Sequence, residues 1–559
     1  MCFGANAPLL LPAGELRSET AKANANMANP PLRVGLLIDT YSLPNWVGRC
    51  IEAIQRSDAA QISLVILNAA PAVGGAPEPL LQRLYRKIDD RRHKRGPDPL
   101  DPMDMASLLA EVPRLLLAAD AVGSFSEVDV EQVERHELDV LLRFGFRRLH
   151  GPILDAARFG VWSYDFGEDR APRGAQPGFA ELARGVVAEP MLVREGATGV
   201  QPLYRSSTAT DRTSLTRTRP NLYFKAAAFA SRKLRDLHIN GEGSLTEQLE
   251  AGADERGSIV PTSAPVHLSR VAARAIGDRF ANLRTRNQWV LGFRFRQPGD
   301  ASGPALSPGG FKLLEPPPGR FWADPFPLEQ DGHFYIFFED YPYDVGKGHL
   351  SVIEIGESGA SGPPVDVLRT DFHLSFPNVF RHQGELFMLP ETSQARQIQL
   401  YRCERFPDRW GLAKVLIDNI SAVDPVVFQR DGRWWMFAGT REPGADGSDE
   451  VSLFHAQSLT GPWKQHACNP VRSSVFASRP AGQVYELDGK LFRPSQNCSR
   501  RYGYGLIIHR IDRISDTDYA ETEVTTLRPE PFGFLGLHTV NHIDKLSVVD
   551  FLRRSPRGP

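Results

Sequence analysis

The C-terminal half of the chain repeats one hairpin four times, and this repeat limits the possible folds more than any other feature. The copies are ADPFPLEQDGHFYIFFED (323–340), FPNVFRHQGELFMLPET (376–392), VDPVVFQRDGRWWMFAGT (423–440) and PAGQVYELDGKLFRPSQN (480–497). Each copy reads as a strand, a turn that ends in glycine, and a second strand. The turn glycines recur every 48 to 57 residues, at positions 332, 384, 432 and 489. That spacing is typical of propeller blades rather than of helical repeats.

A fifth blade and the closure of the ring are predicted from the segments that flank these copies. HTVNHIDKLSVVDF (538–551) follows the fourth copy at blade spacing, although it lacks the Asp-Gly turn. The strand-like segment NQWVLGFRF (287–295) precedes the first copy. Pairing of the first and last segments would remove exposed strand edges. We therefore expect an all-β, five-bladed β-propeller.

Acidic residues recur at equivalent positions of the aligned hairpins. Asp324 and Asp424 stand eight residues before the turn glycine, while Glu339, Glu391 and Gln496 stand seven residues after it. Because a hairpin folds back on itself, both positions lie at the same end of a blade. The five side chains are predicted to share one mouth of the central channel. Carboxylates gathered in one place shift each other's pKa, which suits acid/base chemistry; the alternative is that Asp-Pro is turn chemistry at strand ends.

The Asp-Pro pairs at the start of the first and third copies resemble the five-bladed propeller glycosidases of the arabinanase and xylosidase type. The resemblance implies that Asp324 is the general base and that Asp424 tunes the acid. That family places its acid Glu at the start of blade four, where this chain has Pro480. Glu391 or Glu339 would have to replace the acid. Otherwise the leaving group must already be good, as a nucleotide or lipid phosphate is.

A second resemblance covers residues 321–551. The segments FWADPF, HLSFPNVF, LPETS, LYRCERFPDRW, SRPAGQVY, FRPSQNCSRRYGYG and GLHTVN are similar to the propeller domain at the N-terminus of plant glucosamine inositolphosphorylceramide transferases and of related bacterial proteins. The plant proteins carry a separate glycosyltransferase domain that we do not recognise in this sequence. The resemblance implies a carbohydrate-active propeller.

Further residues at the predicted mouth are candidates for substrate binding. Trp322 could stack on a sugar ring, although aromatic residues on propeller strands more often belong to the core. Arg479 and Arg493 could clamp a phosphate or carboxylate of the substrate. By its blade position, His538 matches a channel histidine of the related glycosidases, and a satisfied buried histidine is an equal alternative. The amides Gln496 and Asn541 complete the candidate set.

The N-terminal half follows a different pattern. LRVGLLIDTY (32–41), WVGRCIEAIQRS (46–57) and ISLVILNAA (62–70) predict a β-α-β unit and a parallel sheet, hence an α/β domain. No Gly-x-Gly-x-x-Gly follows the first strand, which argues against dinucleotide binding. Residues 138–185 resemble the core of folate-dependent formyltransferases, where a strand ending in Asn-x-His precedes an Arg-Gly loop.

Two positions depart from that formyltransferase pattern. Ser163 and Asp165 stand where the family has Asn and His, whereas Arg173 and Gly174 keep the Arg-Gly pair. A carboxylate would repel the oxyanion of a tetrahedral intermediate instead of stabilising it. The resemblance therefore implies a formyltransferase-like fold that has lost formyl transfer.

The boundaries between these regions follow from composition. We expect a disordered tail over residues 1–30, the formyltransferase-like α/β domain over 31–215, a helical linker region over 216–286 and the propeller over 287–555. The linker region should hold helices at 219–237 and 268–286, joined by a polar segment. The Arg-rich stretch 86–98 alternates acids with bases, so a solvated helix end is the favoured interpretation.

Charge and cysteine content exclude several classes of protein. A net charge of −2 argues against nucleic-acid binding, which requires a basic face. No apolar run approaches the roughly 18 residues of a membrane span. The five cysteines are scattered without C-x-x-C, so neither a disulfide framework nor a zinc site is expected. The first 26 residues make a poor signal peptide, and we expect a cytoplasmic protein without metal or cofactor.

The predicted function is sugar transfer or glycoside processing at the propeller channel, in glycolipid or surface-polysaccharide metabolism. The substrate would be a sugar or a sugar phosphate, and the enzyme a glycosyltransferase or a glycosidase. One alternative is formyl or acyl transfer to an amino sugar by the N-terminal domain. The other is a non-catalytic scaffold that binds glycans, which the missing blade-four acid favours.

Overall fold

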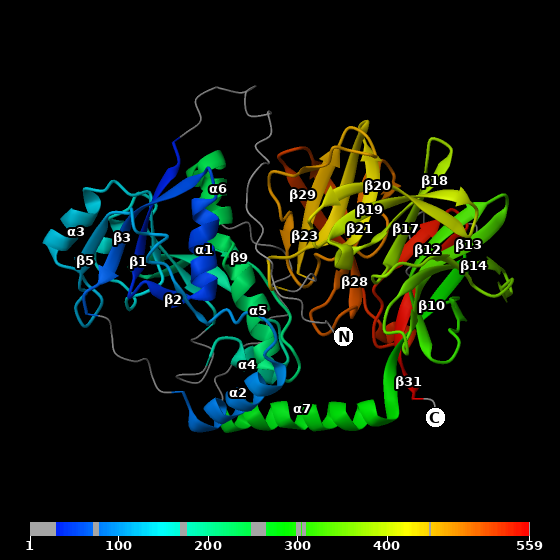
Figure 1. The fold of residues 1–559 in the computed structure, drawn as a ribbon, viewed down its shortest axis with the longest axis horizontal. Helices are drawn as coiled ribbons and strands as arrows, with labels where there is room; N and C mark the ends of the chain where they lie inside the picture. The colour runs from blue at the N-terminus through cyan, green and yellow to red at the C-terminus, as the bar shows by residue number, and fades with distance from the viewer. Residues whose placement is uncertain are drawn as a thin grey trace. The chain divides into compact units, whose positions relative to one another are not determined.

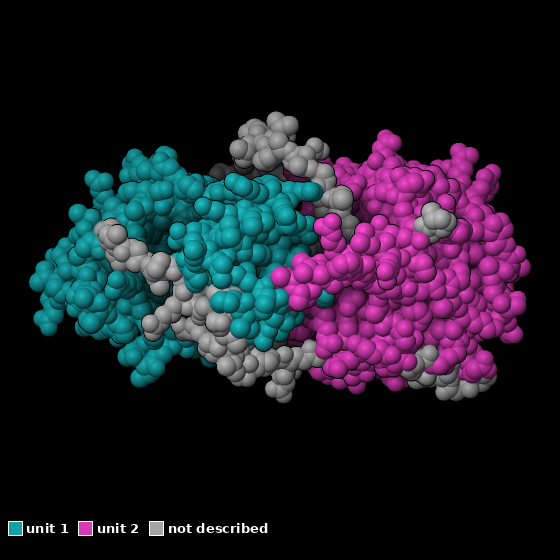
Figure 2. Space-filling model, turned by 90° about the horizontal axis from the view of Figure 1, so that it is seen from below, with its two compact units in different colours: residues 1–206, 210–271, 442–445 teal, residues 207–209, 272–441, 446–559 magenta. Residues whose placement is uncertain are grey.

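The structure is a computed structural model that describes residues 30–70, 78–167, 176–246, 264–297, 303, 309–445 and 449–557. The tail predicted over residues 1–30 lies outside this part, apart from its last residue. The chain divides into two compact units. Unit 1 comprises residues 1–206, 210–271 and 442–445, and unit 2 comprises residues 207–209, 272–441 and 446–559 (Figure 2).

Unit 1 contains a seven-stranded sheet in the order β5-β3-β1-β6-β7-β8-β9 (Figure 1). Five of its strands run parallel, which confirms the predicted α/β class: β1 (Leu32–Ile38), β3 (Ala60–Asn68), β5 (Arg114–Leu117), β6 (Val140–Arg143) and β7 (Val161–Asp165). The strands β8 (Met191–Gly196) and β9 (Gly199–Arg205) extend the sheet in antiparallel fashion. A short pair, β2 (Ser42–Pro44) and β4 (Pro102–Asp104), forms a separate ladder.

The helices α1 (Asn45–Gln55) and α6 (Phe229–Asn240) of unit 1 contact the sheet at β3 and bury apolar side chains. The helix α1 buries Val47, Cys50, Ile51 and Ile54, as its predicted amphipathic pattern requires. The other helices are α2 (Leu80–His93), α3 (Glu127–Glu134), α4 (Phe179–Arg184) and α5 (Leu215–Ala226). The single helix expected over 219–237 is thus two helices, α5 and α6. Both belong to unit 1.

The residues of the formyltransferase resemblance lie on and after β7. Ser163 is buried, and Asp165 Oδ1 accepts a hydrogen bond from the backbone N–H of Gly167 at 2.7 Å. Arg173 and Gly174 lie outside the described residues. The formyltransferase-like fold and its inactivity stay predictions.

Unit 2 is a five-bladed β-propeller, as the repeat predicts. The helix α7 (Ala264–Arg284) continues into β10 (Thr285–Phe295), which belongs to the last blade. Each blade is one antiparallel sheet. Blade one contains β12 (Arg320–Gln330), β13 (His333–Pro342), β14 (His349–Gly356), β15 (Gly359–Ala360) and β16 (Val365–Leu368), and blade two contains β17 (Ser375–His382), β18 (Glu385–Glu391), β19 (Gln397–Arg405) and β20 (Arg409–Asp418). Blade three contains β21 (Val423–Arg430), β22 (Arg433–Thr440), β23 (Glu450–Ala456), β24 (Lys464–Gln465) and β25 (Arg472–Ser473), and blade four contains β26 (Tyr485–Leu487), β27 (Lys490–Asn497), β28 (Gly505–Ile514) and β29 (Tyr519–Leu527). Blade five contains β30 (Val540–Ile543), β31 (Leu546–Pro556), β10 and β11 (Lys312–Leu314).

The ring closes through strands from its two ends in the sequence. β10 pairs with β31 along its whole length, from Thr285 opposite Pro556 to Phe295 opposite Leu546. The closure removes two strand edges that would otherwise be free to pair with other chains. The expectation that the segment before the first copy completes the last blade is confirmed.

The turns of the four repeated hairpins share one backbone conformation. Asp331 and Gly332 both have positive φ, at 53° and 81°. Two consecutive positive φ values are the signature of a type I′ turn, whose twist matches the twist of the flanking strands. The same pairing of positive φ values occurs at residues 383–384, 431–432 and 488–489. The strand–turn–strand interpretation is therefore correct in all four copies.

Candidate active site

At the end of the propeller opposite these turns, three blades share the same irregularity in the pairing of their first two strands. Asp324, Phe376 and Asp424 are non-glycine residues with positive φ, at 54°, 49° and 49°. Each lies where the pairing register of its first strand shifts, and each precedes a proline. A bulge of this kind interrupts pairing and re-aims a side chain. Such backbone conformations cost on the order of 1–3 kcal/mol each, so their recurrence marks this end of the propeller as a candidate site.

Asp324 lies at the meeting point of blades one, two and five. Its Oδ1 accepts a hydrogen bond from Thr539 Oγ1 at 2.7 Å, and its Oδ2 accepts one from the backbone N–H of Phe376 at 3.2 Å. His538 Nε2 lies 3.6 Å from Oδ1. Burial raises the pKa of Asp324 to about 6, because it penalises the ionised form more than His538 stabilises it. A carboxyl group with this pKa can exchange a proton near neutral pH.

Asp550 fixes the backbone that carries Asp324 and His538. Its Oδ1 accepts hydrogen bonds from the backbone N–H groups of His538 and Thr539, each at 3.0 Å. Its Oδ2 accepts one from the backbone N–H of Asp324 at 3.0 Å and lies 2.6 Å from His538 Nδ1. Burial alone would lower the pKa of His538, but Asp550 and Asp324 raise it above its ordinary value. The imidazole therefore lies between two acidic side chains that favour its protonated form.

Glu339 contributes a second carboxyl group from blade one. Glu339 pairs with Ala323 across the hairpin and therefore lies next to Asp324, as the alignment of the hairpins predicts. The side chain is buried, and His373 Nε2 lies 3.6 Å from its Oε1. Burial raises the pKa of Glu339 well above its ordinary value, and the charges of Asp324 and the other carboxylates add to this effect. Glu339 is therefore suited to hold a proton at neutral pH.

Arg479 joins the carboxylates of blades two and three. Its Nε and Nη2 donate hydrogen bonds to Asp424 at 2.6 and 3.3 Å, and its Nη2 lies 3.6 Å from Glu391 Oε2. Ser393 Oγ donates to Glu391 Oε1 at 2.7 Å. Gln496 Nε2 donates to Asp424 Oδ2 at 3.2 Å. Burial raises the pKa of Asp424 to about 7 against the opposing charge of Arg479.

We call Asp324, Glu339, Glu391, Asp424 and Asp550 the acid cluster. Four of its members were predicted from the repeat, and the structure brings those four together with Gln496, Arg479 and His538. The other four members lie within electrostatic reach of Glu339, since each of them contributes to its pKa. Every member is less than a tenth exposed. At the rim, the more exposed ring of Tyr502 lies over the Arg479 guanidinium, 4.9 Å from its carbon.

Three predicted substrate-binding residues lie elsewhere or have other partners. Trp322 is buried in the apolar cluster between blades one and five, against Phe338 at 4.9 Å. Asn541 Nδ2 donates to Pro325 O at 2.8 Å, and its Oδ1 accepts from the backbone N–H of Gln483 at 2.7 Å. Both contacts tie blade five to its neighbours.

Arg493 lies in a separate buried ion cluster of blade four. It donates to both carboxylate oxygens of Glu521, at 2.9 and 2.6 Å, and to the backbone carbonyls of Ala477 and Ser478. Arg493 lowers the pKa of Glu521, and Tyr519 OH also donates to this carboxylate. These contacts occupy the fork of Arg493 inside the protein.

Several residues of the site do not belong to the set predicted from the repeat. Asp550 and Thr539 lie in blade five, which lacks the Asp-Gly turn used to align the other copies. His373 precedes the second copy, and its Nδ1 accepts a hydrogen bond from the backbone N–H of Gly348 at 2.9 Å. A Cβ on Gly348 would lie 2.5 Å from Glu339 Oε1. A structural alignment of blade five on the other blades would have revealed Asp550, whereas sequence spacing gives no signal for Gly348.

Among the described residues, one group of His and acidic side chains has the spacing of a cation site. The ligand atoms of Asp324, His538 and Asp550 all lie within 4.8 Å of one another. Within the group, His538 contacts both acidic side chains, at 2.6 Å from Asp550 Oδ2 and 3.6 Å from Asp324 Oδ1.

The propeller sequence matches a known family model. Residues 314–532 match the model described as "Glucosamine inositolphosphorylceramide transferase 1, N-terminal". The match covers less than half of the chain. The family domain spans blades one to four and includes four of the five members of the acid cluster. The resemblance noted from the sequence motifs is confirmed.

Curated relatives carry the same name. The glucosamine inositolphosphorylceramide transferase 1 of Oryza sativa subsp. japonica is 34% identical over 212 residues, which cover 37% of this chain and 28% of that protein. The Arabidopsis thaliana protein of the same name is 32% identical over 211 residues, with the same coverage. The chain thus spans just over a quarter of the length of these relatives.

A solved structure with a similar fold is the GH43_1 enzyme from Xanthomonas citri in complex with xylose. It matches with a TM-score of 0.32 and 13% identity, covering 42% of this chain and 87% of that chain.

In the described part of this chain, no helix has both the length and the apolar character needed to cross a membrane.

Proposed function

We propose that the propeller binds a sugar or sugar phosphate and that the acid cluster catalyses its transfer or the processing of a glycoside. The observation that carries the proposal is the convergence of Asp324 and Glu339, two buried carboxyl groups with raised pKa values, on one end of the propeller. The name of the plant relatives, which describes a sugar–lipid transferase, supports glycolipid or surface-polysaccharide metabolism.

The roles of the two carboxyl groups follow from their environments. Asp324, with a pKa of about 6, is ionised above that pH and is the general base. Glu339, whose pKa burial raises well above its ordinary value, is the proton donor, in the place of the acid that Pro480 has replaced. Pairs of carboxyl groups whose environments separate their pKa values are the usual arrangement for such acid/base catalysis.

Arg479 adds a site for negative charge beside these two groups. Its Nε and Nη2 donate to Asp424, whereas Nη1 has no hydrogen-bond partner in the described residues. A guanidinium cannot donate a proton at neutral pH, but it stabilises charge that develops on a departing phosphate. Transfer from a phosphate-activated sugar is therefore favoured over hydrolysis of an ordinary glycoside.

The cytoplasm, where the free thiols of the described cysteines would stay reduced, is the proposed location.

The experiment that tests this function is a screen of the purified full chain against nucleotide sugars, lipid-linked sugar acceptors and aryl glycosides. Product formation that disappears in Asp324→Asn is the expected result. Release of free sugar from aryl glycosides would assign glycoside processing, and a new glycosidic bond would assign transfer. A chain that binds sugars by calorimetry but turns over none of these compounds would contradict the proposal.

A non-catalytic glycan-binding scaffold is the second candidate. It is favoured by Pro480, which bridges to Ser495 at the start of blade four and supplies no proton donor. In that case Asp324→Asn and Arg479→Lys would change sugar affinity only. Formyl or acyl transfer to an amino sugar by unit 1 stays an untested alternative, and incubation with 10-formyltetrahydrofolate and amino sugars would detect it.

A further inference from the structure

The helix α2 of unit 1 carries its apolar residues on the outside. Leu80, Leu81, Leu84 and Ile88 are 77%, 51%, 55% and 44% exposed. Their spacing places them on one face of a helix. The side of α2 that packs on unit 1 is polar instead, with Gln82 and Asp89 buried. This arrangement is the reverse of an ordinary amphipathic surface helix, whose apolar stripe faces the core.

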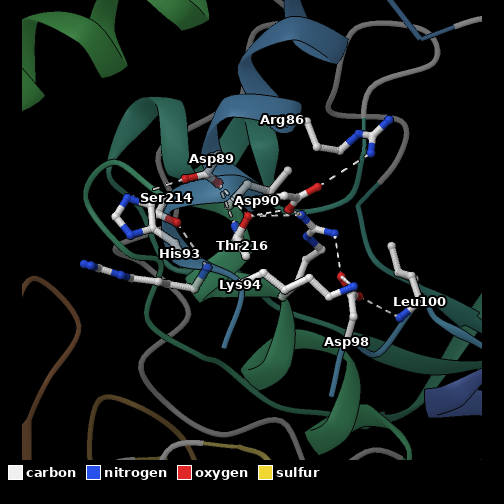
Figure 3. A network of polar contacts seen from close by, with 12 residues as sticks. Arg86, Asp89, Asp90, His93, Lys94, Asp98, Leu100, Ser214 and Thr216 are labelled. Atoms are coloured by element: carbon white, nitrogen blue, oxygen red, sulfur yellow. Dashed lines mark hydrogen bonds and ion pairs between the residues drawn. The ribbon is translucent and has the colours of Figure 1, made fainter. Parts of the chain in front are cut away.

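A buried polar network holds α2 in this orientation (Figure 3). Asp89 Oδ2 accepts hydrogen bonds from the backbone N–H and from Oγ1 of Thr216, each at 2.9 Å. Asp90 Oδ1 accepts from Thr216 Oγ1 at 2.7 Å and from Arg219 Nη2 at 2.5 Å. Arg219 is itself buried and donates to Asp98 at 3.3 Å. Rotation of α2 to bury its leucines would leave these charges unpaired inside the protein, which is costly.

Tyr85 adds a further anchor on the same inner side. Its hydroxyl donates to the backbone carbonyl of Thr213 at 2.7 Å and accepts from the backbone N–H of Leu215 at 3.2 Å. The stretch 86–98 is therefore not the fully solvated helix end that its sequence suggests, because its acids turn inward. The outward-facing apolar stripe is a fixed feature of unit 1 and involves residues of that unit alone.

The exposed surface around this stripe is strongly basic. The exposed charged residues between positions 80 and 95 are all cations: Arg83, Lys87, Arg91, Arg92, Lys94 and Arg95. Arg83 lies 4.0 Å from Glu78, and Lys94 pairs with Asp101 at 3.0 Å. Among the described residues, Lys87, Arg91, Arg92 and Arg95 have no acidic partner within ion-pair distance. We call the four apolar residues together with these six cations the α2 face.

We propose that the α2 face docks on an anionic lipid bilayer. An exposed apolar stripe rimmed by Lys and Arg is the combination that holds a helix in the interface of a membrane, with the apolar side chains among the acyl chains and the cations on the headgroups. A second copy of the chain fits this face poorly, since two such faces would bring a dozen cations together. The proposal rests on unit 1 alone and does not depend on the reaction at the propeller.

The test is co-sedimentation of the full chain with vesicles of phosphatidylcholine alone and of phosphatidylcholine mixed with phosphatidylglycerol. The parent should bind the mixed vesicles, and high salt should weaken the binding. The variant Lys87→Gln/Arg91→Gln/Arg92→Gln should lose on the order of 100-fold in partition, because each cation near an anionic surface contributes roughly a factor of five. The variant Leu84→Gln/Ile88→Gln should lose about tenfold or more, since it removes the inserted apolar area.

Leu412→Thr, at a leucine of β20 that is 53% exposed, is the matched control and should bind as the parent does. Glutamine is a good helix former, so the α2 variants should keep the melting temperature of the parent. Absence of binding to the mixed vesicles, or equal binding by parent and α2 variants, would overturn the proposal. So would light scattering that shows a dimer of the parent which the Leu84→Gln/Ile88→Gln variant abolishes while vesicle binding is unchanged.

Discussion

Arg479 donates two hydrogen bonds to Asp424, at 2.6 and 3.3 Å, and the same guanidinium lies 3.6 Å from Glu391. One cation therefore holds two carboxylates from neighbouring blades. Asp424 is engaged by this pairing, whereas Asp324 accepts hydrogen bonds only from a hydroxyl and a backbone N–H. Asp324 instead has an imidazole beside it, with His538 Nε2 at 3.6 Å, so the two aspartates of the acid cluster differ in the kind of group that faces them.

Asp324→Asn should abolish most of the turnover of any substrate found in the screen. The amide keeps the shape of the carboxyl group but cannot take a proton, and loss of a positioned base costs about 10²- to 10⁴-fold in rate. The parent's rate should rise as the pH passes through about 6, because only ionised Asp324 acts as a base. Rate measurements from pH 5 to 8, with substrate affinity from calorimetry, check both statements. A variant that keeps the parental rate would remove Asp324 from the reaction.

Glu339→Gln should raise the melting temperature at pH 8 and change it little near pH 4. Because the pKa of Glu339 is raised in the folded state, the folded protein binds this proton more tightly than the unfolded chain does. That contribution to stability is present below the ordinary pKa of glutamate and is lost as the pH rises through the folded-state value. Glutamine does not titrate, so the melting temperatures of the variant and of the parent should differ more as the pH rises from 4 to 8.

The same Glu339→Gln variant should lose activity while it gains stability, since it removes the proposed proton donor. A substitution can stabilise the fold and inactivate the enzyme when the residue that it replaces serves catalysis but destabilises the folded protein. Full activity of the variant on a substrate with an ordinary alcohol leaving group would contradict its role as the acid. Activity kept only on substrates with phosphate leaving groups would show that no acid is needed.

Arg479→Lys should reduce the rate far more than the affinity. Lysine keeps the charge but loses the planar fork that holds Asp424, and with it the Nη1 donor that we propose binds the phosphate. Interactions that strengthen only in the transition state appear in kcat rather than in binding. Separate measurements of kcat and KM test this. Weaker binding of sugar phosphates with an unchanged kcat would instead indicate a role in ground-state binding only.

Arg493→Met should destabilise the protein without a selective effect on catalysis. It removes the two shortest guanidinium contacts of the buried Glu521 and leaves Arg472, at 3.3 Å, as the remaining guanidinium in contact with this carboxylate; breaking a buried pair costs about 3–5 kcal/mol. The double variant Arg493→Met/Glu521→Leu removes both charges and should recover part of this loss. Chemical denaturation of the three proteins gives the comparison. A stable Arg493→Met protein with impaired substrate binding would return Arg493 to the substrate site.

Gly348→Ala should lower both stability and rate. Its new Cβ would lie 2.5 Å from Glu339 Oε1 and 2.7 Å from the backbone oxygen of Leu374, so the backbone has to move. Any shift displaces His373, which is hydrogen-bonded to the N–H of residue 348. Gly362→Ala, at an exposed position with open space around it, is the matched control. Equal melting temperatures for the two variants would show that the close approach at Gly348 is easily relieved.

The propeller could be predicted from the amino-acid sequence, because each blade is built from local hairpins whose turn residues and strand spacing recur. The sequence also determined that Asp324 and Glu339 are neighbours, since a hairpin with a known turn fixes which residues face each other. The parallel order of the first strands of unit 1 followed from their continuous apolar runs. Local geometry and periodicity were sufficient for these features.

The contacts between polar residues of different blades could not be predicted from the sequence and depend on the folded arrangement of the chain. Arg479 and Arg493 look alike in the sequence, yet one lies beside Asp424 and the other beside Glu521. Asp550 entered the site through a blade without the turn signal, and α2 turned its acids inward because Thr216 and Arg219, more than a hundred residues away, satisfy them. Pairing of charges in a buried site depends on distances between distant segments, and spacing along the chain carries no information about those distances.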